Sequence, residues 1–131
     1  MPQPIRLLIV EDDTVTRTML AAALGEPDID VVVAVDGAHA LRTALTSPPD
    51  IVLVDIGLPV LDASGFVEQW RERAPAARSV PLVAMSGLPF GRAVSEQIGA
   101  AAFFPKPFDI ALVAQTVRAL AARTGHESPS A

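Results

Sequence analysis

The sequence predicts an α/β protein with three layers, in which a parallel sheet of five strands lies between two layers of helices. Two observations lead to this prediction. Short apolar runs rich in Val, Ile and Leu alternate along the chain with longer segments whose apolar residues recur at helical spacing. The loops between them are short, and strict alternation of strands and helices is typical of a parallel sheet covered on both faces.

The first half of the chain contains three of the predicted strands and two of the helices. Gly25 and Pro27 end the first helix, because glycine at a helix C-terminus and a proline beyond it are common stop signals. The apolar side of that helix is predicted to include Val15 and Met19. In order, these elements are the strand Ile5–Val10, the helix Thr14–Leu24, the strand Val31–Val35, the helix Ala38–Leu45 and the strand Ile51–Val54.

The second half continues the alternation after a third helix. Pro89 and Gly91 keep the segment after the fourth strand from being helical until Arg92, so the fourth helix is predicted to be short. Asp109 is a good N-cap for the last helix. These elements are the helix Gly65–Arg73, a loop Ala74–Ser79, the strand Val80–Met85, the helix Arg92–Ile98, the strand Ala101–Pro105 and the helix Ile110–Ala122.

Five strand–helix units of this kind restrict the topology. Right-handed crossovers leave few strand orders, and the doubly wound, flavodoxin-like order 2-1-3-4-5 is the commonest for five units. With 131 residues, the chain has the length of a single domain. We expect the domain to occupy residues 1–123, and the polar segment 124–131 to be a flexible tail.

Composition excludes several classes of function. The net charge of −5 argues against a general nucleic-acid-binding protein, because no basic stripe is available to neutralise phosphates. The absence of cysteine excludes disulfides, thiolate metal sites and a cysteine nucleophile. We expect no signal peptide, because the N-terminus lacks a basic region followed by a long apolar run, and no uncharged apolar run reaches the length of about 18 residues needed to cross a bilayer. A cytoplasmic protein without membrane insertion is therefore expected.

Acidic residues follow two of the predicted strands. The continuous apolar strand Ile51–Val54 ends at Asp55, and the first strand is followed by Asp12 and Asp13. In the order 2-1-3-4-5 strands 1 and 3 are neighbours, so these acids are expected to converge at the sheet edge where such folds bind ligands. Alone, Asp55 is equally consistent with an ordinary strand-end or cap residue, and Asp12 or Asp13 is also placed to cap the first helix.

Converging carboxylates require a counter-charge. They must either take up protons or hold a cation, and oxygen ligands alone favour Mg²⁺. Ser86 and Lys106 end strands 4 and 5, so a hydroxyl and an ammonium are predicted at the same edge. A cation, a lysine and a hydroxyl around one aspartate would bind a phosphoryl group and stabilise charge on its oxygens. Asp55 would then be the nucleophile that forms an aspartyl phosphate.

Five short motifs, in order and at the expected strand ends, resemble a known family. The chain is similar from Ile5 to about Arg123 to the receiver domain of bacterial two-component response regulators, and to the stand-alone, chemotaxis-regulator-like type in particular. The motifs are Val10-Glu11-Asp12-Asp13, Asp55 to Pro59 with Leu61-Asp62 beyond, Ser86-Gly87, Gly99-Ala100 and Lys106-Pro107-Phe108.

The resemblance implies a role for each acid. Asp55 would be the phospho-acceptor, and Asp12 and Asp13 would be the acid pair that holds Mg²⁺ together with Asp55. The carbonyl of Gly57, two residues past the acceptor, would complete the metal shell. Gly57 and Leu88 would occupy the variable positions that tune the lifetime of the phosphoryl group, with Leu88 partly shielding it from water.

The remaining implied roles concern the phosphoryl oxygens. Ser86 would bond one of them in the active state, with the amide of Gly87 beside it, and Lys106 would pair with another. The Lys106–Pro107 peptide bond is expected to be cis. Phe103 matches the aromatic residue whose rotamer reports the state of Ser86, although an ordinary packed aromatic residue is an equally simple interpretation.

The function implied is a phosphorylation-dependent switch and not a turnover enzyme. A sensor histidine kinase or a histidine phosphotransfer protein would be the donor. A downstream protein would bind the face formed by helix 4, strand 5 and helix 5, and phosphorylation-dependent homodimers are a further possibility, with no direct contact to nucleic acid. The chain is either a stand-alone receiver or a domain of a longer protein.

Three alternatives compete with this interpretation. A degenerate receiver would act as a phosphorylation-independent interaction module. A flavodoxin would need to bind the FMN phosphate, which the acids at 11–13 would repel. A phosphatase that uses an aspartyl phosphate would need a second acid two residues after the nucleophile, where this chain has Gly57.

The chain departs from the family pattern in two places. Ala63 and Ser64 precede Gly65, which predicts a loop two residues longer after the acceptor. The segment between Ser86 and Lys106 is about two residues short, which alters the expected geometry of the fourth helix. Four other polar residues are interpreted as solvated surface positions, namely His39, Arg71, Arg73 and His126.

Overall fold

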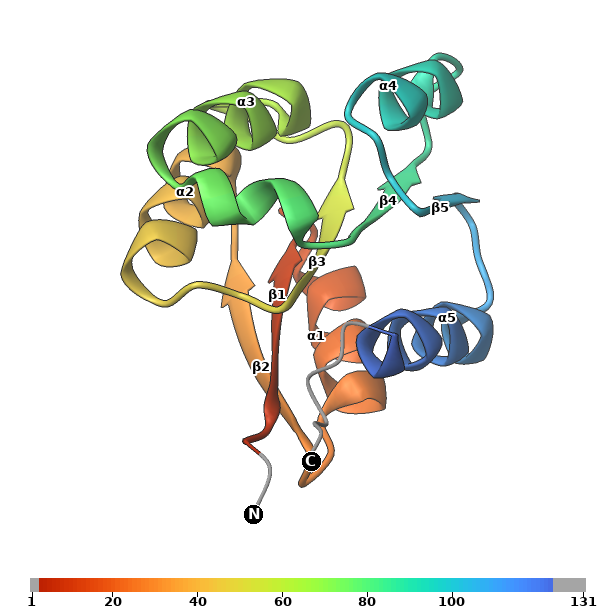
Figure 1. Cartoon of the computed structure of the whole chain (residues 1–131). Coiled ribbons are helices and arrows are strands. Elements are labelled where there is room, and N and C mark those ends of the chain that lie inside the picture. Colours follow the sequence, from red (N-terminus) through yellow and green to blue (C-terminus); the bar gives the residue numbers. More distant parts are fainter. Residues whose placement is uncertain (1–2, 124–131) are drawn as a thin grey trace.

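The computed structural model describes residues 3–123 and contains a five-stranded sheet in the order β2-β1-β3-β4-β5, in which all neighbouring strands are parallel (Figure 1). The predicted fold class and strand order are therefore confirmed. The strands are β1 (Ile5–Val10), β2 (Ile29–Ala34), β3 (Ile51–Asp55), β4 (Leu82–Ser86) and β5 (Ala102–Pro105). The helices are α1 (Thr14–Leu24), α2 (Gly37–Thr46), α3 (Ala63–Arg73), α4 (Gly91–Gln97) and α5 (Ile110–Ala122), with a 3₁₀ helix η1 (Pro75–Ser79) where a loop was predicted.

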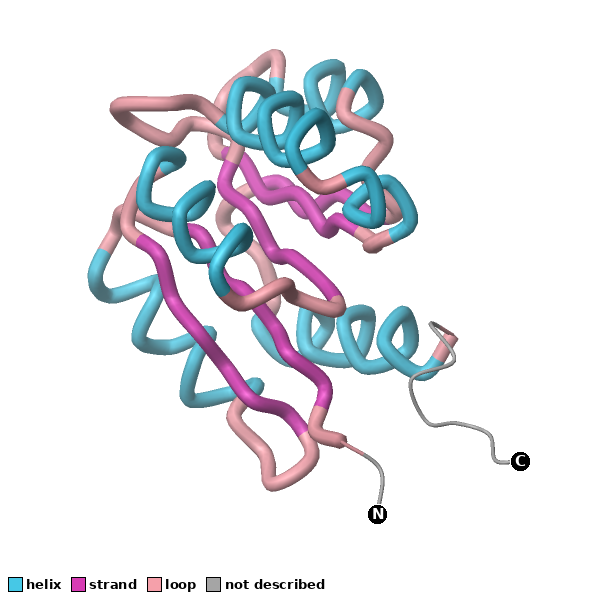
Figure 2. The backbone as a smooth tube through the Cα atoms, turned by 60° about the vertical axis from the view of Figure 1, so that its left-hand side comes forward, coloured by secondary structure: helices cyan, strands magenta, loops and turns pink. Residues whose placement is uncertain are grey.

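Helices cover both faces of the sheet (Figures 1 and 2). Leu8 and Val10 of β1 point into the core beneath α2 and α3, which includes the stacked rings of Phe66 and Trp70. Leu7 and Ile9 point to the opposite side, into the core beneath α1 and α5. Because side chains alternate along a strand, the central strands are apolar on both faces, and polar residues are confined to their ends.

The first helix packs differently from the prediction. Its buried residues are Leu20 and Leu24, whereas Val15 and Met19 are 65% and 51% exposed. Leu20 and Leu24 are four residues apart and therefore lie on one face of the helix, and both contact the core beneath α1 and α5. The apolar side that includes Val15 and Met19 faces away from the sheet, so this part of the prediction was wrong.

The third helix begins earlier than predicted, at Ala63. The carboxylate of Asp62 accepts a hydrogen bond of 2.8 Å from the amide of Gly65, which is the geometry of an N-cap. Ala63 is buried and Ser64 is in the first helical turn. The two extra residues therefore lengthen the helix and not the loop, and the prediction of a longer loop was wrong.

Two residues interpreted as solvated have structural partners. Arg71 is half-buried, and its Nη1 donates a 3.0 Å hydrogen bond to the carbonyl of Ile98 at the end of α4. His39 is half-buried in the first turn of α2, where its Nδ1 accepts a 3.2 Å hydrogen bond from the amide of Val35. Arg73 is exposed, as expected. The predictions for 124–131, including His126, lie outside the described residues.

The short fourth helix, as predicted, spans seven residues, and it starts in contact with the end of β4. A Cβ atom added at Gly91 would collide with both Cβ and Oγ of Ser86. Only glycine fits at this position, because the first residue of α4 lies directly against the residue that ends the strand. The shortened connection thus brings α4 close to the sheet edge that carries the acids.

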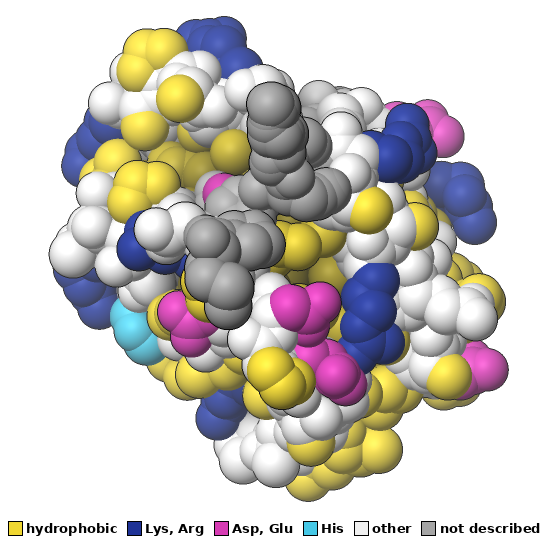
Figure 3. All heavy atoms as spheres, turned by 60° about the horizontal axis from the view of Figure 1, so that its bottom comes forward, with side chains coloured by type: hydrophobic (Ala, Val, Ile, Leu, Met, Phe, Trp, Pro, Cys, Tyr) yellow, Lys and Arg dark blue, Asp and Glu magenta, His cyan; other side chains and the backbone are white. Residues whose placement is uncertain are grey.

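The surface carries charges of both signs. Figure 3, which brings the bottom of Figure 1 forward, shows basic and acidic side chains interspersed among apolar ones on this face. Among residues 3–123, no helix combines the length and apolar character needed to span a bilayer.

The loop between β3 and α3 contains a strained residue. Val60 has φ of 69°, and the amide of Leu61 donates a 2.8 Å hydrogen bond to the carbonyl of Pro59, which closes a γ-turn around Val60. The left-handed region costs a residue with a Cβ atom about 1–2 kcal/mol, and a β-branched side chain fits it especially badly. Since Val60 is 82% exposed, its side chain contributes little packing in return.

We therefore predict that Val60→Gly raises the free energy of unfolding by about 1 kcal/mol, because glycine adopts this backbone without strain even after its larger entropy loss on folding is counted. Urea denaturation measures the change. Val15→Gly is the matched control, since Val15 is also exposed but lies in a regular helix, and it should lower stability by about 0.5 kcal/mol. Equal losses of stability in Val60→Gly and Val15→Gly would contradict the strain at Val60.

Candidate functional site

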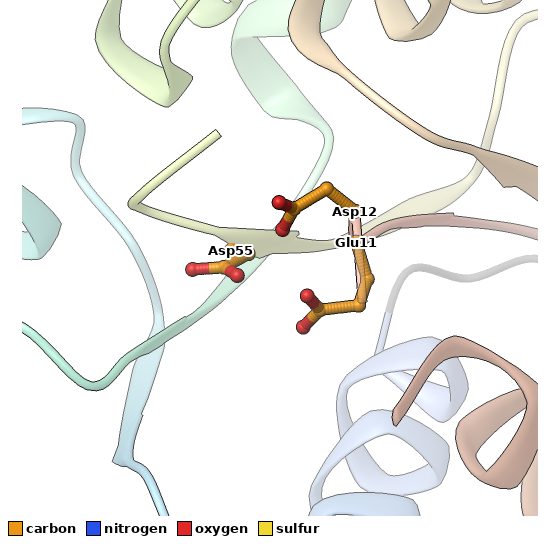
Figure 4. A group of neighbouring side chains, drawn as sticks. All are labelled: Glu11, Asp12 and Asp55. Atoms are coloured by element: carbon orange, nitrogen blue, oxygen red, sulfur yellow. The ribbon is translucent and has the colours of Figure 1, made fainter. Parts of the chain in front are cut away.

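Three carboxyl groups converge at the carboxyl edge of the sheet, where β1 and β3 end. One oxygen from each of Glu11, Asp12 and Asp55 lies within 4.8 Å of the others. Val10 pairs with Val54 in the sheet, so the residues that follow these two are brought side by side. Figure 4 shows the carboxyl groups of Glu11 and Asp12 directed toward Asp55 from two sides. The acids after β1 and β3 therefore meet, as the topology predicted.

The membership of this cluster differs from the prediction in one residue. Asp13, which was expected to join Asp12 and Asp55, is the N-cap of α1, and its carboxylate accepts hydrogen bonds from the amide and hydroxyl of Thr16 at 2.9 and 2.6 Å. These bonds lower the pKa of Asp13. Glu11 occupies the third place instead. The sequence held a signal for this difference, because Asp13 immediately precedes the predicted helix, which is the position of an N-cap residue.

Lys106 links the two buried acids. Its Nζ lies 2.8 Å from Oε1 of Glu11 and 2.9 Å from Oδ2 of Asp55. The other oxygens are also bonded, since the amide of Gly57 donates to Oδ1 of Asp55 at 3.0 Å and the amide of Asp13 donates to Oε2 of Glu11 at 3.1 Å. Both carboxylates are thus held in fixed orientations by donors from three separate segments of the chain.

Burial and charge alter the acid–base properties of this cluster. Glu11 has no exposed surface, and its desolvation raises its pKa to about 7, although the hydrogen bond from Lys106 acts in the opposite direction. Burial of Lys106 favours its neutral form, but its hydrogen bonds and attraction to Glu11 and Asp55 outweigh this effect and raise its pKa. The lysine therefore stays charged at neutral pH.

Ser86 ends β4, which pairs with β3, and Phe103 lies on β5, the next strand along the sheet. The buried Oγ of Ser86 accepts a 2.9 Å hydrogen bond from the amide of Leu88. Phe103 is half-buried, and the guanidinium carbon of Arg92 lies 4.9 Å from the centre of its ring. A Cβ atom at Gly91 would be 3.4 Å from the ring of Phe103, so the start of α4 contacts both residues.

The loop after β5 positions Lys106. Its peptide bond to Pro107 is cis, as expected. A Cβ atom added at Gly87 would lie 3.7 Å from Cβ of Lys106, so these loops are in contact. All the predicted site residues thus lie at one edge of the sheet, although the carboxylate of Asp13 caps α1 instead of joining the acids, and their individual roles stay predictions.

The donor set fits a hard divalent cation. Within the described residues the side chain of Asp12 has no hydrogen bond or ion pair, whereas both oxygens of Glu11 and Asp55 are bonded. Asp12 is also the exposed member of the three. Carboxylate oxygens of this kind are the ligands that Mg²⁺ prefers. Asp12 and Asp55 would hold the ion directly, while Glu11 holds Lys106.

Residues 7–118 match the family model of the response regulator receiver domain. The chain belongs to this family. It is 34% identical over 125 residues to the transcriptional regulatory protein PrrA of Mycobacterium tuberculosis, a match that covers 95% of this chain and 53% of PrrA. It is 30% identical to the alkaline phosphatase synthesis transcriptional regulatory protein PhoP of Bacillus subtilis, with coverage of 95% and 52%. The receiver domain thus spans about half the length of the curated relatives it matches.

Solved receiver domains have the same fold. The receiver domain of the sensor histidine kinase PA1611 from Pseudomonas aeruginosa, which has a magnesium ion coordinated in its active-site cleft, is 29% identical, with a TM-score of 0.80 and coverage of 91% and 98%. The receiver domain of the Francisella response regulator 1452 is 25% identical, with a TM-score of 0.80 and coverage of 95% and 99%.

The raised pKa of Glu11 predicts a pH dependence of stability. Between pH 4.5 and about 7 the folded receiver domain binds the Glu11 proton more readily than the unfolded chain does. The contribution of Glu11 is therefore fully present below pH 4.5 and is lost as the pH rises through 7. In the absence of metal, the free energy of unfolding of the wild type should fall by on the order of 1 kcal/mol relative to that of Glu11→Gln as the pH rises across this window.

Urea denaturation of both proteins in EDTA at several pH values between 4 and 8 measures this difference. Glu68→Gln, which removes an exposed acid from α3, controls for the loss of one charge. If the free energies of unfolding of the wild type and Glu11→Gln change with pH in parallel, the raised pKa of Glu11 is contradicted.

Proposed function

We propose that this receiver domain accepts a phosphoryl group on Asp55 in a Mg²⁺-dependent reaction, and that it acts as a switch and not as a turnover enzyme. The donor is a phosphohistidine of a sensor histidine kinase or of a histidine phosphotransfer protein. The observation that carries this proposal is the environment of Asp55. Its two oxygens are held by the Lys106 ammonium at 2.9 Å and by the Gly57 amide at 3.0 Å. The carboxylate of Asp12, which has no hydrogen bond or ion pair within the described residues, lies beside them.

Transfer requires one new bond and one broken bond. A carboxylate oxygen of Asp55 attacks phosphorus, and the phosphorus–nitrogen bond of the phosphohistidine breaks, with its electron pair returning to the imidazole of the donor. Lys106 lies where it can offset the charge on the phosphoryl oxygens. When bound by Asp12 and Asp55, Mg²⁺ supplies further positive charge at those oxygens. The products are an acyl phosphate on Asp55 and a free histidine on the donor.

Glu11 supports this chemistry without contacting the phosphoryl group. Its carboxylate lies 2.8 Å from the Lys106 ammonium, which also bonds Asp55. When phosphorylation removes the carboxylate charge of Asp55, the bond to Glu11 keeps the ammonium in the site. Lys106 can then pair with a phosphoryl oxygen instead of moving into solvent.

Ser86 connects the phosphoryl group to the surface. Its Oγ accepts from the amide of Leu88 and lies against Gly91, and its hydroxyl proton is available for a phosphoryl oxygen. Rotation of Ser86 toward the phosphoryl group breaks the bond to Leu88 and relieves the contact with Gly91 at the start of α4. Phosphorylation thus shifts the population between two arrangements of α4. The face formed by α4, β5 and α5 binds the downstream protein or a second phosphorylated copy.

The decisive experiment is an intact-mass spectrum after incubation with acetyl phosphate and Mg²⁺. We expect one added phosphoryl group on the wild type, none without Mg²⁺ and none on Asp55→Asn. Asp62→Asn is the matched control, because Asp62 follows the same strand but only caps α3, and it should be modified like the wild type. No adduct on the wild type would identify a degenerate receiver that binds its partner without phosphorylation.

Leu88 is predicted to set the lifetime of the phosphoryl group. Its Cδ1 would lie 3.2 Å from a Cβ atom at Gly57, and so its side chain covers the glycine next to Asp55. Leu88→Ala should accelerate dephosphorylation roughly severalfold, because it opens a path for attacking water. The rate follows from the decay of the phosphorylated mass. Leu112→Ala removes a similarly exposed leucine from α5 and should leave the rate unchanged. An unchanged rate in Leu88→Ala would exclude this role.

A further inference from the structure

Arg17 of α1 contacts the loop that carries the acids. Its Nη1 donates hydrogen bonds to the carbonyl of Glu11 at 2.9 Å and to the carbonyl of Asp12 at 3.3 Å. Its Nη2 lies 3.4 Å from Oγ1 of Thr14. The guanidinium is half-buried, so water competes only in part for these carbonyls. One side chain thus bonds two residues of the turn between β1 and α1 and the first residue of α1.

These contacts influence the direction in which the Asp12 side chain points. Two successive carbonyls face one donor, which fixes both peptide planes around Asp12 and therefore the direction of its Cα–Cβ bond. Within the described residues, the carboxylate of Asp12 has no hydrogen bond or ion pair of its own. Glu11, by contrast, is held through its side chain by Lys106 and the Asp13 amide. The orientation of Asp12 therefore depends on its backbone, in which both flanking carbonyls bond Arg17 and the amide of Asp13 bonds Glu11.

We propose that Arg17 is a positioning residue for the divalent cation. By holding the carbonyls of Glu11 and Asp12, it keeps the Asp12 carboxylate directed at Asp55, and in this way it raises the affinity of the site for Mg²⁺. This inference rests on the proposed function, since it concerns the cation that the three acids would bind.

The sign of the effect separates positioning from electrostatics. Arg17 carries a positive charge close to the acids, and a charge of that sign repels a divalent cation. If Arg17 acted only through its charge, its removal would strengthen Mg²⁺ binding. If it positions Asp12, its removal weakens binding, and loss of a group that orients a metal ligand typically lowers metal affinity about 10- to 100-fold.

Calorimetric titration of the metal-free chain with Mg²⁺ tests this inference. We expect Arg17→Gln to weaken binding roughly tenfold and Arg17→Lys, which keeps the charge and one donor group, to weaken it less. Arg42→Gln is the matched control, because it removes the same charge from an exposed position on α2 and should bind Mg²⁺ at least as tightly as the wild type.

Each outcome has one meaning. Affinity equal to or above that of the wild type in Arg17→Gln overturns the positioning role and leaves the proposed function intact. Absence of Mg²⁺ binding in the wild type overturns both. Thermal unfolding of each variant checks its fold. If Arg17→Gln does not fold, Arg17→Lys decides the question, since its charge is unchanged and wild-type affinity would exclude a need for the guanidinium.

Discussion

The buried ion cluster of Lys106, Glu11 and Asp55 is the interaction on which the site depends. Two carboxylates share one ammonium at 2.8 and 2.9 Å, and a third carboxylate, that of Asp12, lies beside them with no ion pair to any residue from 3 to 123. Burial makes this excess of negative charge costly, as the raised pKa of Glu11 indicates. A proton or a cation can offset the excess. The cluster thus combines an acceptor carboxylate with an environment that favours the binding of a positive charge, and removal of Lys106 would leave two buried carboxylates unpaired.

The sheet makes this arrangement possible. Lys106 is 95 residues from Glu11 and 51 from Asp55 in the sequence, yet parallel strands in the order β2-β1-β3-β4-β5 bring their carboxyl ends to the same edge. The strands themselves are apolar on both faces, so the fold draws its stability from packing that does not involve the site. This separation allows the edge to hold strained or mutually repelling groups, such as Val60 and the three acids, at little cost to the core.

The sequence was sufficient to predict the fold class, the strand order and the position of Asp55, Ser86 and Lys106, because each follows a strong apolar run at a strand end. It was insufficient for the third acid. Whether Glu11 or Asp13 faces Asp55 depends on the residue at which the strand ends and the helix begins, and Lys106, which holds Glu11, is distant in the sequence.

The exposed Val15 and Met19 show the same limit of prediction from sequence, here for the buried face of a helix. Several helical faces were apolar enough to pack, and contact with α5 determined which one did. The contacts of Arg17 were missed because its hydrogen-bond acceptors are backbone carbonyls, which every residue has and which leave no pattern in the sequence.

The short connection between β4 and α4 has a mechanical consequence for the proposed switch. Gly91, the first residue of α4, lies against Ser86, and the amide of Leu88 is bonded to the hydroxyl of the same serine. In a longer connection, flexible residues would absorb a rotation of Ser86 before it reached the helix. Here the serine, the loop and the helix are joined by direct contacts within the six residues from Ser86 to Gly91. At its other end, α4 is held by the bond from Arg71 to the carbonyl of Ile98. Under the proposed switch, a displacement at Ser86 would reach the start of α4 directly, while the bond from Arg71 of α3 holds Ile98, the residue that follows the helix.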